Sequence, residues 1–156
     1  MLHSFNVHQG NGHEMICGTD NELRERVSIF DVYNATIYPH DNEARAFITY
    51  NYPLINNQTM QDDGYLALLR QELPRVLDEE RPDLIIYNAG TDVLDGDRLG
   101  NMHITENGII ERDALVFRSA HERHIPIAMV LSGGYTQQSA RIIGRSIVNI
   151  VNHVIQ

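Results

Sequence analysis

Three reactive side chains in this sequence each follow a short apolar run and stand next to glycine. They are an imidazole, a carboxylate and a phenol: His8, Asp92 and Tyr135, within the segments Phe5–Gly12, Leu84–Asp92 and Ile127–Tyr135. An apolar run that ends at glycine is typical of a buried parallel strand followed by a tight loop. Ligands collect beyond the carboxyl ends of the strands in open parallel sheets. We therefore predict that the three side chains converge at one sheet edge, as in a metal site with a phenol beside it.

The bulk composition is that of an ordinary soluble domain. The chain has 156 residues, of which 42% are hydrophobic and 21% are charged, enough for one domain with a sizeable core. A net charge of -9 argues against direct binding to nucleic acid. No apolar run is long enough to cross a membrane, and the N-terminus has no secretory pattern. With Cys17 as its single cysteine, the chain is expected to be intracellular, in cytoplasm or nucleus.

The elements that must position these side chains alternate between strand and helix. Strands are predicted over residues 26–33, 83–88 and 126–131, with a short one at Phe47–Asn51, and helices over 63–80, 105–122 and 136–153. Thr105 is the expected N-cap of the second helix, and Pro74 is expected to kink or divide the first. This order predicts an α/β fold with a parallel β-sheet flanked by helices.

Two elements carry more specific expectations. The last helix is predicted to carry five apolar side chains: Ile142, Ile143, Ile147, Ile150 and Val151. The first strand offers only Leu2, Phe5 and Val7 as apolar residues, so it is more polar than a strand in the middle of a parallel sheet normally is.

The motifs resemble those of the histone deacetylase family, and most of all its class IV branch. The matching segments are His8–Glu14, Asp31–Asn34, Ile37–Pro39, Tyr87–Asp92, Gly96–Gly100 and Ser132–Tyr135. The resemblance extends over essentially the whole chain, and it implies an arginase/deacetylase-like α/β fold. It also implies a single zinc ion (Zn2+) and the hydrolysis of acyl-lysine amides. Zinc suits such a reaction because it acts as a Lewis acid and lowers the pKa of bound water to about 7.

The same resemblance assigns roles to particular residues. It implies that His8 and Asp92 are metal ligands and that Tyr135 is the catalytic tyrosine that polarises the substrate carbonyl. A tyrosine hydroxyl can donate to the oxyanion that forms during amide hydrolysis. Three further residues fall near the substrate channel: Tyr38, Leu99 and Gly134.

Two departures from the family pattern bear on activity. Asn6 occupies the third metal-ligand position, where the family has aspartate, and its neutral amide is a poorer zinc donor. Zinc binding is therefore expected to be weakened or lost. None of the eight histidines is adjacent to another, whereas the family uses a tandem His-His pair as general base and acid. We expect residues 1–156 to be a partial, C-terminal catalytic domain in which the ligand strand lacks a neighbour on at least one side.

Two functions from different classes remain open at this point. The leading interpretation is a zinc-dependent histone deacetylase-like hydrolase that removes acetyl or longer fatty acyl groups from lysine. The alternative is an inactive deacetylase-like fragment or a binding module. A third interpretation, an arginase-like enzyme, is disfavoured. Such an enzyme needs a carboxylate two residues after the metal-binding histidine, and this chain has Gly10 two residues after His8. The expected partners are an acyl-lysine protein or peptide, and either a missing N-terminal half or further copies that meet through an exposed sheet edge. Neither direct nucleic-acid binding nor membrane association is expected.

Two acidic positions have competing interpretations. Asp92 could also be a loop cap that shares a solvated acidic turn with Asp95 and Asp97. Asp31 could hold a secondary monovalent cation, as the resemblance implies, or serve as a buried capping residue.

Overall fold

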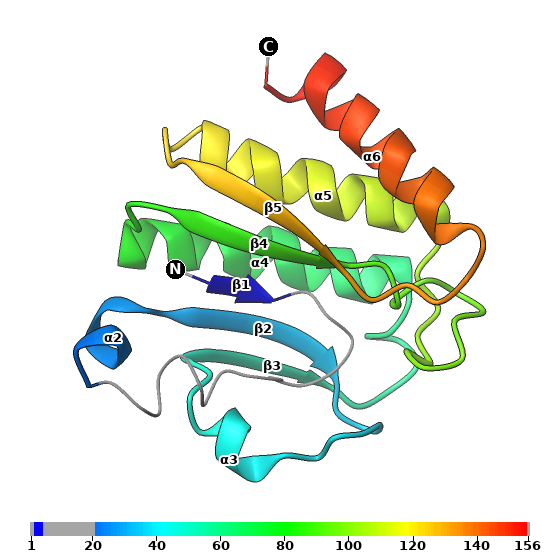
Figure 1. Ribbon diagram of the computed structural model, residues 1–156, viewed down its shortest axis with the longest axis horizontal. Helices are drawn as coiled ribbons and strands as arrows, with labels where there is room; N and C mark the ends of the chain where they lie inside the picture. Colours follow the sequence, from blue (N-terminus) through cyan, green and yellow to red (C-terminus); the bar gives the residue numbers. More distant parts are fainter. Residues whose placement is uncertain (1, 5–20, 156) are drawn as a thin grey trace.

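Five parallel strands form one sheet in the computed structural model, which describes residues 2–4 and 21–155 (Figure 1). The strands lie in the order β3-β2-β1-β4-β5. Their bounds are β1 Leu2–Ser4, β2 Ile29–Asn34, β3 Tyr50–Leu54, β4 Ile85–Gly90 and β5 Ile127–Ser132. The predicted fold class, a parallel sheet flanked by helices, is confirmed. The third strand begins three residues later than the predicted start at Phe47.

The short first strand lies at the centre of the sheet, in spite of its polar composition. Leu2 pairs in parallel with Ile29 of β2 on one side and with Ile86 of β4 on the other. The expectation that this strand lacks a neighbour is therefore wrong. The hydrogen-bonded ladders on both sides hold β1 through its backbone, which does not depend on side-chain polarity.

Three helices cover one face of the sheet: α4 Asp62–Glu80, α5 Glu106–His121 and α6 Ser139–His153 (Figure 1). Helix α4 buries an apolar stripe at helical spacing, which includes Leu66, Leu69 and Leu73. Pro74 lies within α4 and does not divide it, contrary to one of the two expected outcomes. The predicted N-cap of α5 is confirmed, because the Gly108 N–H donates to Thr105 Oγ1 at 3.1 Å.

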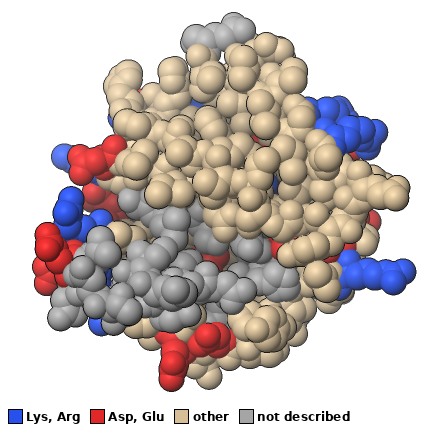
Figure 2. Space-filling view, viewed as in Figure 1, with Lys and Arg blue, Asp and Glu red and all other residues tan. Residues whose placement is uncertain are grey.

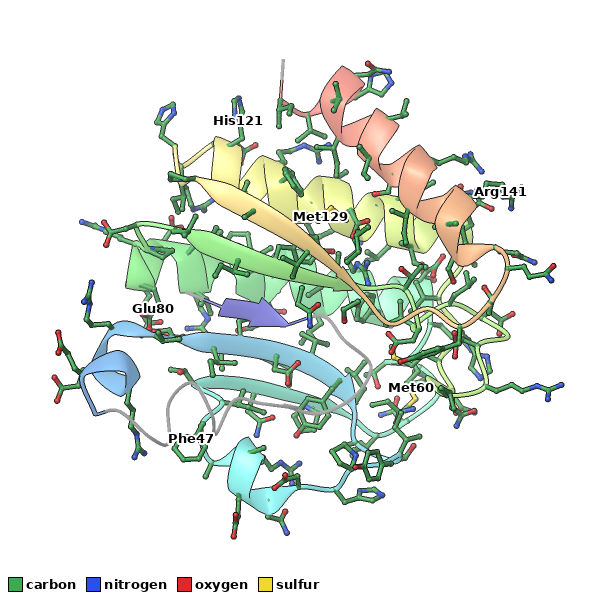
Figure 3. The ribbon with its side chains drawn as sticks, viewed as in Figure 1. Phe47, Met60, Glu80, His121, Met129 and Arg141 are labelled. Atoms are coloured by element: carbon green, nitrogen blue, oxygen red, sulfur yellow. The ribbon has the colours of Figure 1, made fainter. Side chains whose placement is uncertain are left out.

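A smaller core covers part of the opposite face. Ile29, Tyr33 and Ile48 form a buried cluster there, with Phe47 packed against it. The short helices α2 (Asn21–Arg26) and α3 (Asn42–Arg45) lie beside β2 and β3 on this side of the molecule (Figure 1). The Arg24 guanidinium lies 5.2 Å from the centre of the Phe47 ring, whose position is labelled in Figure 3.

Helix α6 buries only part of its apolar stripe. Ile142 and Ile150 are buried, whereas Ile147 is 42% exposed and Val151 is 51% exposed. The helix packs against α5 through one side only, so the rest of its wide apolar stripe meets no described residue that would bury it. Among the described helices, none is both long and apolar enough to cross a membrane.

Candidate active site at the carboxyl edge of the sheet

The parallel arrangement brings the carboxyl ends of all five strands to one edge of the sheet. Asp92 follows β4 at this edge and Tyr135 follows the neighbouring strand β5. Figure 3 marks the two ends of the sheet: Met60 lies near the carboxyl edge and Glu80 lies at the opposite end. The carboxyl end of β1 also lies at this edge, but Asn6 and His8 fall outside the described residues.

The Asp92 carboxylate is buried directly beneath the loop that carries Tyr135. Its side chain is fully shielded from solvent. Gly133 in that loop has φ +61°, and a Cβ atom at this position would lie only 2.5 Å from Cγ of Asp92. The glycine is required for two reasons: the left-handed backbone conformation, and the contact between the loop backbone and the carboxylate. The structure thus brings together two of the predicted functional positions.

Asp97 joins the two loops that follow β4 and β5. One oxygen, Oδ2, accepts the Tyr135 N–H at 2.8 Å, and the other, Oδ1, accepts the Leu99 N–H at 2.9 Å. The side chain is buried, so the interpretation of Asp97 as part of a solvated acidic turn is wrong. Asp95 does fit that description, since it is exposed and bonds Nδ1 of His103. Asp97 therefore positions the backbone of Tyr135.

Asn34, at the end of β2, forms hydrogen bonds to the same loop after β4. Its amide nitrogen donates to the carbonyl oxygens of Gly100 and Asn101, at 3.0 and 3.2 Å. Its amide oxygen accepts from both the N–H and the hydroxyl of Thr36. The side chain is buried and thus fixes the segment after β4 against the segment after β2.

The predicted substrate-contacting side chains point outward from this braced framework. Tyr135 is 63% exposed, and Tyr38 and Leu99 are also exposed. Gly134 has φ +91°, and the side chains of Thr91 and Ser139 occupy the space that a side chain at this position would need. The backbone positions near Tyr135 are therefore tightly held while its phenol remains accessible.

A buried charged network supports the strand end from the helix side. Nη1 of Arg112 in α5 donates to the Gly90 carbonyl at 2.7 Å, and Nε donates to Asp113 Oδ1 at 2.9 Å. Asp113 also accepts from the hydroxyls of Tyr87 and Ser146, the latter at 2.6 Å. Burial alone would lower the pKa of Arg112, but the Asp113 carboxylate raises it well above its ordinary value. Arg112 thus stays charged and holds the strand two residues before Asp92.

Of the predicted metal donors, only Asp92 belongs to the described part of the chain. No group of three His, Cys, Asp or Glu side chains among residues 2–4 and 21–155 is close enough to hold a metal ion. Asp92 is a suitable oxygen donor at the expected edge, buried against the backbone of Gly133. A complete zinc site would need donors from outside the described residues.

Sequence patterns missed Asp97, Asn34 and Arg112 as supporting residues. Asp97 and Asn34 lie within segments that match the family, but their hydrogen bonds join loops that are distant in sequence. Arg112 is three residues after the buried Ile109 and four before the buried Val116. This spacing places Arg112 on the inward face of α5. It is the sequence pattern that could have identified Arg112 as a buried residue.

Gly133→Ala is expected to lower the free energy of unfolding by about 2–4 kcal/mol, because it adds a clash with Asp92 to the strain of a left-handed residue. Gly96→Ala is the matched control: Gly96 has φ +86°, but nothing lies within 4 Å of the added Cβ. Its cost should be only about 1 kcal/mol, from the backbone strain. Urea denaturation of both variants measures the difference, and equal losses would contradict the close contact with Asp92.

The chain matches the histone deacetylase domain model over residues 4–151. It is 47% identical to histone deacetylase 2 of Arabidopsis thaliana over 150 residues, which are 96% of this chain and 37% of that protein. The acetylpolyamine aminohydrolase of Burkholderia pseudomallei shares the fold with a TM-score of 0.75 and 20% identity, over 98% of this chain and 44% of that one. The HDA15 HD domain shares the fold with a TM-score of 0.69 and 18% identity, over 96% of this chain and 43% of that one.

These relatives are longer proteins, and this chain spans less than half the length of each. The two solved structures show the fold alone. The domain match over nearly the whole chain, together with the 47% identity, shows that this chain belongs to the histone deacetylase family.

Proposed function

We propose that this chain forms the C-terminal part of a zinc-dependent histone deacetylase-type hydrolase that removes acyl groups from lysine. The proposal rests above all on one observation: the buried Asp92 carboxylate lies against the loop that presents the exposed Tyr135. A carboxylate donor and a phenol donor at the same sheet edge are what this reaction needs. Membership of the histone deacetylase family supports the same chemistry.

In this proposal Asp92 and His8 hold the metal, with Asn6 as a weak third donor. The bound zinc supplies Lewis-acid chemistry that activates water and polarises the acyl carbonyl. The Tyr135 hydroxyl donates a hydrogen bond to the carbonyl oxygen as negative charge develops there. Asp97 positions Tyr135 through its backbone N–H, so the hydroxyl begins from a fixed main chain. Tyr38, Leu99 and Gly134 line the approach of the acyl group.

The departures at Asn6 and at the family's histidine pair favour a second candidate, an inactive fragment or binding module. Without a positioned base and acid, hydrolysis loses about 10²–10⁴-fold in rate. We therefore propose that this chain alone hydrolyses acyl-lysine far more slowly than a complete deacetylase.

A peptide assay tests the role of Tyr135. Acetyl-lysine and myristoyl-lysine peptides are incubated with the chain in the presence of zinc, and both binding and turnover are measured. Tyr135→Phe should weaken zinc-dependent binding or turnover by about tenfold or more, because it removes one donor to the carbonyl oxygen.

Tyr38→Phe is the matched control, since it also removes a hydroxyl from an exposed tyrosine but retains the ring that lines the channel. It should behave as the parent chain does. Peptide binding that needs no zinc and is unaffected by Tyr135→Phe would favour the binding-module alternative.

A further inference from the structure

Four positions in the sequence place an aspartate or asparagine directly before glycine: Asn11, Asp63, Asp95 and Asn107. At such a pair the glycine nitrogen can attack the preceding side-chain carbonyl carbon, because glycine has no Cβ to hinder the approach. The pair at Asn11 lies outside the described residues, and the pairs at Asp63 and Asn107 lie within α4 and α5. In the described part of the chain, the pair at Asp95 is therefore the one that lies in a loop.

Asp95 and Gly96 form an exposed turn in the loop that follows β4. The Asp95 side chain is 64% exposed, and nothing lies within 4 Å of a Cβ placed on Gly96. The N–H groups of Asp95 and Asp97 donate to the carbonyls of Ile104 and Leu94, whereas the Gly96 N–H makes no hydrogen bond to a described residue. The loop projects from the carboxyl edge of the sheet on the right of Figure 1, and in the same view in Figure 2 this edge of the molecule faces solvent. The Gly96 nitrogen is thus free to approach the Asp95 carboxyl group.

The two helical pairs lack this freedom. A Cβ on Gly64 would lie 2.2 Å from the carbonyl oxygen of Gln58, so the Gly64 backbone is packed against the segment before α4. The Gly108 N–H donates to Thr105 Oγ1 at 3.1 Å. In both cases the helix must open locally before the glycine nitrogen can reach the preceding side chain.

His103 places an acid beside the Asp95 carboxylate. Its Nδ1 atom lies 2.8 Å from Asp95 Oδ1, and both side chains are at least half exposed. In its protonated form the imidazole donates to this oxygen, and it can transfer the proton if the oxygen leaves. The turn therefore combines a free nucleophilic nitrogen, an accessible carboxyl group and a proton donor.

We propose that Asp95–Gly96 is a site of backbone rearrangement to isoaspartate, with His103 as the acid. The Gly96 nitrogen forms a bond to Asp95 Cγ, and Oδ1 leaves as water with one proton from the Gly96 N–H and one from the imidazolium. Water then adds to the cyclic imide. Cleavage between the nitrogen and Cγ restores aspartate, whereas cleavage between the nitrogen and the main-chain carbonyl carbon leaves the chain linked through Cγ. Water is the only co-reactant, and the proposal does not depend on the proposed hydrolase activity.

The rearrangement alters the support of Tyr135. Linkage through Cγ adds one methylene group to the main chain two residues before Asp97. The Asp97 N–H donates to the Leu94 carbonyl at 3.0 Å across this turn, and Asp97 Oδ2 accepts the Tyr135 N–H at 2.8 Å. Both bonds depend on the present length of the connection between Leu94 and Asp97. Isoaspartate at position 95 is therefore expected to release the Tyr135 N–H from Asp97.

Ageing of the full 156-residue chain tests the proposal. The protein is kept at physiological temperature and pH for several weeks and is then digested. Chromatography separates the isomeric peptides, and electron-based fragmentation identifies the chain linked through Cγ at each position. Isoaspartate at Asp95 should exceed that at Asp63 by about tenfold or more, because α4 must open before Asp63 can react. Equal accumulation at the two positions, or none at Asp95, would overturn the proposal.

Matched variants test the chemistry and its consequence. Asp95→Glu keeps the carboxylate but requires a larger ring, so it should abolish the rearrangement. His103→Gln removes the transferable proton and should slow it by about tenfold or more. In the aged parent chain, hydrogen exchange at the Tyr135 amide should be about tenfold faster or more than in fresh protein, and aged Asp95→Glu should show no change. An unchanged rate in His103→Gln, or a Tyr135 amide that is equally protected in fully rearranged protein, would contradict the proposal.

Discussion

Arg112→Met is expected to lower the free energy of unfolding by about 3–5 kcal/mol. Methionine matches the length and volume of the arginine stem, but it leaves the Asp113 carboxylate buried without its cation. The Gly90 carbonyl loses its donor in the same step. A domain of this size has a total stability of about 5–15 kcal/mol, so the variant loses a large fraction of it.

Loss of the Arg112–Asp113 pair is expected to be strongly destabilising because the pair is buried. An exposed ion pair serves as the control. Arg70 and Glu111 form an ion pair with both side chains at least half exposed. Arg70→Met should cost less than about 1 kcal/mol, because water replaces the lost partner. Guanidinium denaturation measures both variants. Equal small losses would mean that the Arg112 network contributes nothing to holding β4, α5 and α6 together.

The elements of the fold were largely predictable from the sequence, for a physical reason. Buried parallel strands need continuous apolar runs, and those at β4 and β5 are plain in the sequence. The N-cap at Thr105 was equally direct, since it depends on one residue and its own helix. The central place of β1 was not predictable, because its pairing is a backbone property and its neighbours are distant in sequence.

The candidate site was predictable only in part. Asp92 and Tyr135 were placed at one edge by their positions after strands, which the parallel sheet confirms. Asp97 was misread because a charged residue in a turn is usually solvated, and only the fold brings the Tyr135 N–H to it. The exposed face of α6 was not predictable, because helical spacing identifies an apolar stripe but does not say what covers it.

Asp92→Asn is expected to weaken zinc binding by more than the 10–100-fold that loss of an outer-shell partner costs, because it replaces a charged carboxylate that binds the metal directly with a neutral amide. The matched control is Asp95→Asn, which makes the same change three residues later at an exposed side chain that bonds His103. It should leave the zinc affinity near that of the parent chain. Asn6→Asp should strengthen binding, because it supplies the carboxylate charge that the amide lacks.

Calorimetric zinc titration of the parent chain and these three variants therefore tests the central claim, that the carboxyl edge of the sheet holds a zinc ion on Asp92. The predicted result is one zinc per chain, with binding lost in Asp92→Asn, retained in Asp95→Asn and tightened in Asn6→Asp. The account would be contradicted by equal zinc affinity in the parent chain and Asp92→Asn, or by a chain that binds no zinc even with Asp at position 6.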